Sequence, residues 1–163
     1  MKPKLYLLCG LPASGKTTFA NKLHQEAGAT IFSIDKLMIE MFKFKTNDEF
    51  KQRYEDTRLI IKGKTKSLIA DGKSVILDFG FWKKQDREEM IQKGKSWGAD
   101  VVIYYFKSDL AALHKRLDLR NKNLSENTPL IVTHEFLDNF ATEGKINLTL
   151  LNTEITSNTR KFS

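Results

Sequence analysis

CGLPASGKTT, residues 9–18, decides the fold of this chain. It contains the spacing G-x-x-x-x-G-K-[ST], the pattern of a phosphate-binding loop, which needs a strand before it and a helix after it. Residues 4–9 form a short apolar run that predicts a buried strand, and residues 17–27 have helical periodicity that ends at Gly28. The residues expected to hold a phosphate-bearing cofactor are Gly10, Leu11, Pro12, Ala13, Ser14, Gly15, Lys16, Thr17 and Thr18.

The chemistry of such a loop assigns a role to its last residues. Backbone N–H groups encircle the β-phosphate, and the N-terminus of the following helix adds the positive end of its dipole. Lys16 is predicted to reach the β- and γ-phosphates, and Thr17 to bind Mg²⁺. The alternative interpretation is an ordinary glycine turn followed by a surface lysine. The strand and helix predicted on either side favour the phosphate loop.

The rest of the chain alternates strands with helices. Further strands are predicted at residues 30–35, 75–79, 101–106 and 146–151. Further helices are predicted at residues 36–44, from a capping box of Thr46 with Glu49 up to Asp71-Gly72, at residues 86–97, after a cap at Ser108 or Asp109, and at residues 133–143. This alternation predicts a parallel sheet covered on both faces. The expected fold class is therefore α/β, a three-layer P-loop NTPase fold with a parallel sheet of about five strands.

Size and composition predict one soluble domain over residues 1–163, with a lid at about 109–131 and a polar tail at 152–163. The net charge of +7 favours anionic partners. The single cysteine, Cys9, excludes an intrachain disulfide and a cysteine zinc cluster, and it fits a reducing compartment. No apolar run is long enough to span a bilayer and the first residues lack the features of a signal peptide, so a cytoplasmic location without membrane contact is expected.

Two carboxylates lie where ligands bind in such sheets, beyond the carboxyl ends of the strands. Asp78 is predicted to end the third strand, where it would be a second Mg²⁺ ligand, unless it only caps a turn. Phe79 follows Asp78 in place of a glutamate that would polarise water, which favours transfer to another acceptor over hydrolysis. Asp35 is predicted to end the second strand, where it would be a general base for an acceptor hydroxyl or a helix cap.

Several cationic and aromatic residues are weaker candidates. Arg116 and Arg120, four residues apart on a predicted helix, would close over the nucleotide phosphates or form a solvated helix face. Arg87 is a third candidate for the phosphates or the acceptor, and Trp82 for the wall of an acceptor pocket. The basic residues between Lys36 and Lys66 are interleaved with acidic ones, a pattern more typical of a solvated face than of a polyanion site.

Together these motifs resemble the small P-loop kinases related to the 5′-hydroxyl domain of polynucleotide kinase, to zeta-toxin-like kinases and to chloramphenicol phosphotransferase, a group often described only as AAA-type ATP-binding proteins. The resemblance covers about residues 5–140 and rests on residues 9–18, 33–35, 75–88 and 101–121. It implies a fold like that of nucleoside and adenylate kinases with a short helical lid. It also implies ATP as phosphate donor, Mg²⁺, a hydroxyl group as acceptor, Asp35 as base, and Arg116 and Arg120 as lid arginines.

The sequence thus predicts an ATP-dependent kinase whose acceptor is a small hydroxyl-bearing molecule. A 5′-hydroxyl end of a nucleic acid is the alternative acceptor, which the net charge favours. Met38 stands in the stretch where polynucleotide kinases carry an arginine, which favours the small molecule. A protein of another class, an ATP-dependent switch without phosphate transfer, is also compatible with the phosphate loop. The sequence predicts neither the identity of the acceptor nor the oligomeric state.

Overall fold

The computed structural model of the chain describes residues 1–42, 47–123 and 132–143. Its strands are β1 (Lys4–Gly10), β2 (Thr30–Ser33), β3 (Val75–Gly80) and β4 (Asp100–Phe106). Its helices are α1 (Lys16–Ala27), α2 (Ile34–Phe42), α3 (Asn47–Ala70), α4 (Lys84–Ser96), α5 (Leu110–Lys122) and α6 (His134–Glu143). These described strands form one sheet in the order β2-β3-β1-β4, and every neighbouring pair is parallel.

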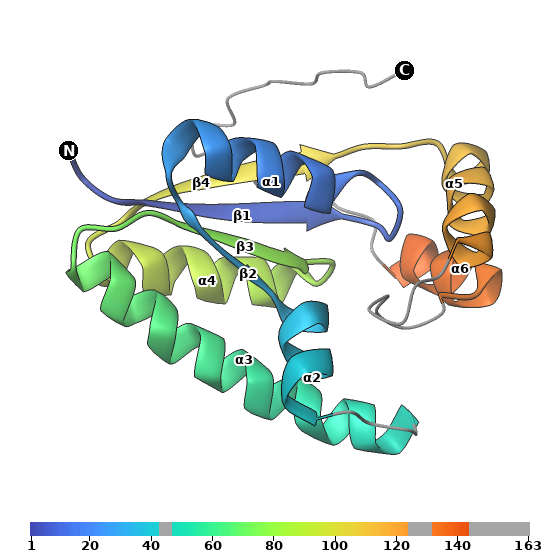
Figure 1. The fold of residues 1–163 in the computed structure, drawn as a ribbon, viewed down its shortest axis with the longest axis horizontal. Coiled ribbons are helices and arrows are strands. Elements are labelled where there is room, and N and C mark those ends of the chain that lie inside the picture. Colours follow the sequence, from blue (N-terminus) through green and yellow to red (C-terminus); the bar gives the residue numbers. More distant parts are fainter. Residues whose placement is uncertain (43–46, 124–131, 144–163) are drawn as a thin grey trace.

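Figure 1 shows the three layers: α1 covers one face of the sheet, and α3 and α4 cover the other. Helices α5 and α6 lie beyond the carboxyl ends of the strands, toward which the arrows of β1 and β4 point. The predicted α/β fold with a parallel sheet is confirmed. None of the helices in the described ranges is both long and apolar enough to cross a bilayer.

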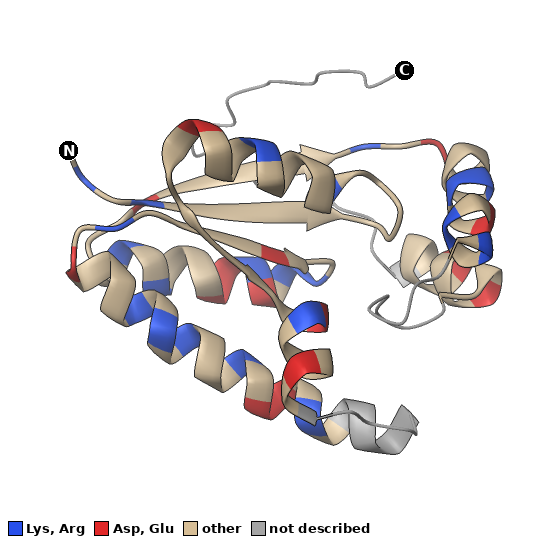
Figure 2. Ribbon diagram, viewed as in Figure 1, with Lys and Arg blue, Asp and Glu red and all other residues tan. Residues whose placement is uncertain are grey.

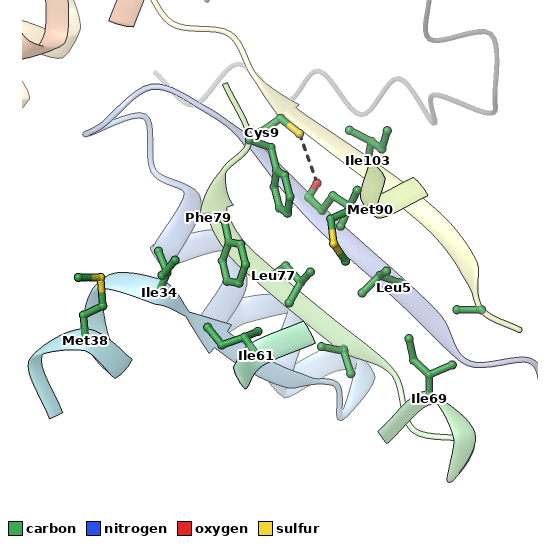
Figure 3. Close-up of a cluster of buried hydrophobic side chains, with 14 residues drawn as sticks. Leu5, Cys9, Ile34, Met38, Ile61, Ile69, Leu77, Phe79, Met90 and Ile103 are labelled. Atoms are coloured by element: carbon green, nitrogen blue, oxygen red, sulfur yellow. Dashed lines mark hydrogen bonds between the residues drawn. The ribbon is translucent and has the colours of Figure 1, made fainter. Parts of the chain in front are cut away.

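Strand β1 is buried on both faces, as central strands of parallel sheets are. Leu5, Leu7 and Cys9 point into a cluster on the side of α3 and α4, shown in Figure 3. Tyr6 and Leu8 point into a second cluster on the side of α1. The helices contribute Ile61, Ile69 and Met90 to the first cluster and Ala20 and Leu23 to the second. Because each buried aliphatic side chain contributes about 1.5–3 kcal/mol, these clusters fix the strand ends that carry the site.

The described sheet has four strands, one fewer than expected, because the fifth predicted strand, residues 146–151, lies outside the described residues. Also outside them are the end of the predicted lid (124–131), the polar tail (152–163) and Thr46 of the predicted capping box. The predicted cap at Asp109 is confirmed: its carboxylate accepts a hydrogen bond of 3.2 Å from the Ala112 N–H.

Two predicted strand ends are wrong, and both concern candidate carboxylates. Asp35 does not end β2, because the chain turns into α2 at Ile34 and places Asp35 in the first helical turn. Asp78 does not end β3, because the pairing of Cys9 with Gly80 keeps β3 extended for two further residues. Asp78 nevertheless lies near the carboxyl end of the sheet, beside the end of β2, since its partner Ser33 is the last residue of that strand.

Candidate active site

The phosphate-loop segment connects β1 to α1 with an unusual backbone. Ala13 has a φ of 61° and Gly15, which precedes α1, has a φ of 91°. The Ser14 N–H donates to the Leu11 carbonyl over 3.3 Å, which closes the turn. No side chain caps the N-terminus of α1. The first N–H groups of the helix are therefore available to an anion, as a phosphate-binding loop requires.

Gly10 allows this loop to begin directly beside Phe106 of β4. A Cβ atom at this position would lie 2.9 Å from the Cβ of Phe106 and 3.0 Å from Oγ of Ser14. Because carbon atoms do not pack at such a distance, any larger residue would displace β4 or the loop. The sequence motif thus has a steric reason at its first glycine as well as a chemical one.

Lys16 folds its side chain back over the loop. Its Nζ donates to the Leu11 carbonyl over 2.7 Å and lies 3.4 Å from Oγ of Ser14. Burial lowers the pKa of the Lys16 ammonium, and the carboxylates of Asp78 and Asp35 counteract this by raising it. The cation is therefore held beside the loop amides, with two carboxylates in electrostatic range.

Thr17 and Asp78 meet at the end of the sheet. The Thr17 hydroxyl donates to Oδ2 of Asp78 over 2.7 Å, and Asp78 is only 8% exposed. A hydroxyl and a carboxylate are hard oxygen donors, which suit Mg²⁺. In the described residues no group of three or more His, Cys, Asp or Glu side chains forms a metal site. The pair thus fits Mg²⁺, an ion that typically keeps several waters and takes phosphate oxygens alongside one or two protein ligands.

Asp35 lies in the first turn of α2, within electrostatic range of Asp78, and its side chain is exposed at the surface. Desolvation by the surrounding protein is the largest cause that raises the pKa of the Asp35 carboxyl. The Asp78 carboxylate raises this pKa as well, and Arg120 and Lys16 lower it to a smaller extent. Lys16, Asp35, Asp78 and Arg120 therefore form one electrostatically coupled group, although they come from four different elements.

The two candidate lid arginines are placed differently. Arg120 of α5 acts electrostatically on both Lys16 and Asp35, and its side chain is partly buried. Arg116 is exposed on the same helix. Helix α5 is fixed to α6 by a small apolar cluster, against which Leu11 and Ala13 of the loop also pack. The structure thus brings Arg120 into the coupled group and leaves Arg116 on the surface.

A family model described as an AAA domain matches residues 5–142, most of the chain and all of the residues described above. The chain belongs to this AAA-domain family. The family resemblance seen in the motifs is thereby confirmed. No curated protein matches this chain in sequence.

Solved structures with the same fold include several P-loop proteins. A chain of the Pnkp1/Rnl/Hen1 RNA repair complex superposes with a TM-score of 0.70 at 22% identity, over 86% of this chain and 43% of that one. A gluconokinase from Sinorhizobium meliloti superposes with a TM-score of 0.62 at 12% identity, over 92% of this chain and 79% of that one. Kti12 from Chaetomium thermophilum, in complex with ADP-AlF3, superposes with a TM-score of 0.65 at 18% identity, over 86% of this chain and 79% of that one.

The chain spans less than half of the RNA repair chain, so that likeness concerns one part of a longer protein. At these identities the superpositions establish the fold: a P-loop NTPase fold of the kind found in kinases.

The turn after β3 contacts the loop in a way that the sequence did not predict. Gly80 has a φ of 82° and Phe81 a φ of 45°, a conformation that is strained for an aromatic residue. This turn places Trp82 so that its indole Nε1 donates to the Gly10 carbonyl over 3.0 Å. Phe140 of α6 packs against the Trp82 ring, with 4.2 Å between ring centroids. Trp82 therefore links β3, the phosphate loop and α6.

Arg87 stabilises this turn through hydrogen bonds to its backbone. It is only 6% exposed, and its Nη1 donates to the carbonyls of Phe81 over 2.9 Å and Trp82 over 2.8 Å. These contacts assign Arg87 a structural role in place of the phosphate contact considered from the sequence. The only sequence signal for this turn is a glycine followed by two aromatic residues, and by itself that signal is too weak to predict it.

Proposed function

We propose that the protein is an ATP-dependent kinase that transfers the γ-phosphate of Mg-ATP to a hydroxyl group of a small molecule. The observation that carries the proposal is the coupled group at the carboxyl end of the sheet. It combines a loop lysine, a hydroxyl–carboxylate pair joined over 2.7 Å and a second carboxylate that is coupled to them electrostatically. Phosphoryl transfer needs these parts, because its catalysis is mostly positioning and charge stabilisation.

Each residue has a role in this proposal. The loop from Gly10 to Thr18 binds the nucleotide phosphates through its N–H groups, and Lys16 neutralises their charge. Thr17 and Asp78 would hold Mg²⁺, which would supply positive charge against the charge that develops on the transferring phosphoryl group. Arg120, with α5 as part of a lid, would contribute a further positive charge. Arg116 joins it only if α5 moves when the lid closes.

Asp35 is proposed as the residue that activates the acceptor. Its carboxylate accepts the proton of the acceptor hydroxyl while the hydroxyl oxygen forms a bond to the γ-phosphorus. The bond from that phosphorus to the bridging oxygen breaks, and ADP leaves. A raised pKa makes Asp35 a stronger base than an ordinary aspartate, provided that it is ionised at the working pH.

A 5′-hydroxyl end of a nucleic acid is the second candidate acceptor. Two observations favour it: the net charge of +7 and the superposition on a chain of an RNA repair complex. A nucleic acid acceptor would bind more weakly as salt increases, because each neutralised phosphate releases counterions. The salt dependence of the acceptor KM separates the two candidates.

The experiment is transfer of labelled γ-phosphate from Mg-ATP to pools of nucleosides, sugars, antibiotics and 5′-hydroxyl oligonucleotides. Lys16→Met and Asp35→Asn should both lose the labelled product. Lys22→Met, an exposed lysine on the same helix, and Asp100→Asn, at the opposite end of the sheet, are the matched controls and should keep it. Consumption of ATP without any labelled acceptor, unchanged in Asp35→Asn, would instead favour an ATP-dependent switch.

A further inference from the structure

The turn after β3 is shaped so that the indole of Trp82 folds back onto the end of that strand. Gly80 permits this in two ways. Its φ of 82° is one that residues with a Cβ atom rarely adopt, and a Cβ atom there would lie 2.7 Å from Nε1 and Cε2 of Trp82. The indole therefore packs directly against the Gly80 backbone, and any larger residue at that position would displace it.

The next residues of the turn are held in place by several contacts at once. The Phe81 ring stacks on Phe79 in the core, with 5.4 Å between centroids, although the φ of Phe81 is 45°. Arg87 donates hydrogen bonds to the carbonyls of Phe81 and Trp82. A strained backbone persists only where its surroundings determine it in this way, and such positions cluster at functional sites. What these contacts fix is the position of Trp82.

The first contact of the indole is with the phosphate loop. Its Nε1 donates to the carbonyl of Gly10, the last residue of β1 and the first of the loop motif, over 3.0 Å. The next carbonyl, that of Leu11, accepts hydrogen bonds from Lys16 and Ser14. Because the Gly10 carbonyl and the Leu11 N–H belong to one planar peptide, the Trp82 bond also fixes the direction of that N–H. A loop ordered before binding loses less freedom when it binds a phosphate.

The second contact of the indole is with α6. The centroids of the Trp82 and Phe140 rings lie 4.2 Å apart, and the rings are tilted by 45°. Phe140 also contacts the edge of Phe136, with 4.4 Å between centroids. Tilted and edge-to-face arrangements are those that aromatic rings prefer. The Trp82–Phe140 pair is therefore a specific packing contact between the turn and α6.

Charge does not explain why α6 lies beside a loop that binds phosphates. The helix carries acidic residues and neither lysine nor arginine. Figure 2 shows acidic positions on α6, and both basic and acidic ones on α5. A phosphate bound in the loop would repel such an acidic helix. The position of α6 therefore depends on packing contacts, among which is the ring of Trp82.

Helices α5 and α6 form one unit, which lies beyond the end of β1 in Figure 1. The small apolar cluster between them is reinforced by two hydrogen bonds of 2.7 Å. The bonds are reciprocal, each joining a histidine of one helix to an aspartate of the other: His114 to Asp138 and His134 to Asp118. A displacement of α6 would therefore displace α5, and with it Arg120.

We propose that Trp82 is a positioning residue of the nucleotide site. Its Nε1–H sets the first peptide of the phosphate loop, and its ring, through Phe140, sets where the α5–α6 unit holds Arg120. The inference rests on the nucleotide binding contained in the proposed function, and it does not require phosphate transfer. Trp82 acts through Gly10 and Phe140 and touches no reacting atom.

The contact with the loop is tested by the affinity for Mg-ADP, measured by isothermal titration calorimetry. Trp82→Phe keeps an aromatic ring and removes the N–H donor, so the Kd should rise by roughly fivefold to twentyfold. Trp97→Phe makes the same change at the chain's other tryptophan, just after α4, and should leave the Kd unchanged. Because calorimetry reports the fraction of binding protein separately from the Kd, partial loss of folded protein does not imitate the effect.

A spectroscopic measurement leaves Trp82 intact and serves if Trp82→Phe does not fold. In Trp97→Phe, Trp82 is the remaining tryptophan of the chain. Its emission should change when Mg-ADP saturates the protein, because the bound phosphates place negative charge next to the loop peptide that the indole contacts.

The link to Arg120 is tested by the preference for a triphosphate, which is the Kd for Mg-ADP divided by the Kd for the β,γ-imido analogue of Mg-ATP. Arg120→Gln should lower this ratio by roughly tenfold. Phe140→Leu removes the ring contact and keeps an aliphatic side chain, so it should lower the ratio by roughly threefold to tenfold. In the double variant Phe140→Leu should have no further effect, because the arginine that it positions is gone. Leu119→Ala, at an exposed position of α5, is the control and should keep the native ratio.

The results that overturn the inference differ in what else they remove. An unchanged Kd for Mg-ADP in Trp82→Phe, or unchanged Trp82 emission at saturation, overturns the contact with the loop as a positioning contact. Absence of any effect of Phe140→Leu, or an effect that persists beside Arg120→Gln, overturns the link to Arg120. Absence of nucleotide binding by the native chain overturns the proposed function and this inference together. Binding with the expected effects but without phosphate transfer overturns the kinase alone.

Discussion

Thr17 and Asp78 are joined by a hydrogen bond of 2.7 Å from the threonine hydroxyl to the carboxylate Oδ2, although 61 positions separate them in the chain. The contact joins the first turn of α1 to β3, the strand that pairs with β1. It also places two hard oxygen ligands side by side at the mouth of the phosphate loop.

This pair gives the first prediction. Thr17→Val removes the hydroxyl and keeps the shape, so the apparent affinity for Mg²⁺ in the transfer reaction should fall by about 10- to 100-fold. Thr17→Ser keeps the hydroxyl and should retain most of that affinity. Titration of activity with Mg²⁺ at saturating ATP measures both. Equal Mg²⁺ curves for the valine and serine variants would contradict a metal role for Thr17.

The second prediction separates the two lid arginines. Arg120→Gln should lower kcat by about 100-fold, because Arg120 lies in the electrostatic group with Lys16 and Asp35. Arg116→Gln, at an exposed position of the same helix, should lower kcat by less. Steady-state kinetics of both variants give the comparison. A larger effect for Arg116 would mean that α5 rotates when nucleotide binds.

The third prediction concerns Asp35 and pH. Because its pKa is raised, the ionised base is lost at a higher pH than for an ordinary aspartate, and kcat/KM should fall as pH decreases through that raised pKa. Asp35→Asn should lower kcat by about 100-fold or more. A pH profile of kcat/KM that shows no acidic limb above the ordinary aspartate pKa would contradict this role.

The fourth prediction is that Asp35→Asn increases the stability of the protein at neutral pH. A carboxyl whose folded-state pKa is raised favours folding below its unfolded-state pKa, and this contribution is lost as pH rises through the folded-state pKa. At neutral pH the ionised group therefore opposes folding, and Asp35→Asn should raise the melting temperature while it removes activity. The difference in melting temperature from the native chain should shrink in acid. Thermal denaturation across pH tests the sign.

The fifth prediction concerns the turn after β3. Arg87→Met removes the donor of two hydrogen bonds, one to a buried and one to a partly buried carbonyl, so the free energy of unfolding should fall by about 2–4 kcal/mol. For a chain of this size that corresponds to a decrease of roughly 5–15 °C in melting temperature. Lys84→Met, an exposed lysine on the same helix, is the control. Trp82 fluorescence should change in Arg87→Met, since the indole contact with Gly10 depends on the turn.

The sequence predicted those parts of the fold that depend on interactions between neighbouring residues. The phosphate loop is specified by consecutive residues, so its place between β1 and α1 was predicted correctly. Strands such as β4 were predicted because β-branched and aromatic residues follow one another. The errors at Asp35 and Asp78 arose because the ends of β2 and β3 are set by pairing with neighbouring strands. The local sequence does not predict this pairing.

The candidate site was predicted less completely than the fold. Lys16, Thr17, Asp35 and Asp78 were all named from the sequence, and the structure brings them together. The difference between Arg116 and Arg120 depends on how α5 is oriented, which helical spacing does not give. The contact of Trp82 with the phosphate loop and the buried role of Arg87 both depend on a strained turn. These features depend on contacts between distant parts of the chain, which local sequence patterns do not predict.

The sheet order has a consequence for how the protein comes into being. All neighbouring strands are parallel, so none of the described pairs is a hairpin that forms from adjacent chain. The phosphate loop precedes β3 and β4 in the chain, so during synthesis β1 has no partner until those two strands emerge. Such long-range pairing makes folding slow, and until it is complete no neighbouring strand stabilises the loop. A nucleotide that binds the completed loop would therefore raise the free energy of unfolding only of chains whose sheet has already formed.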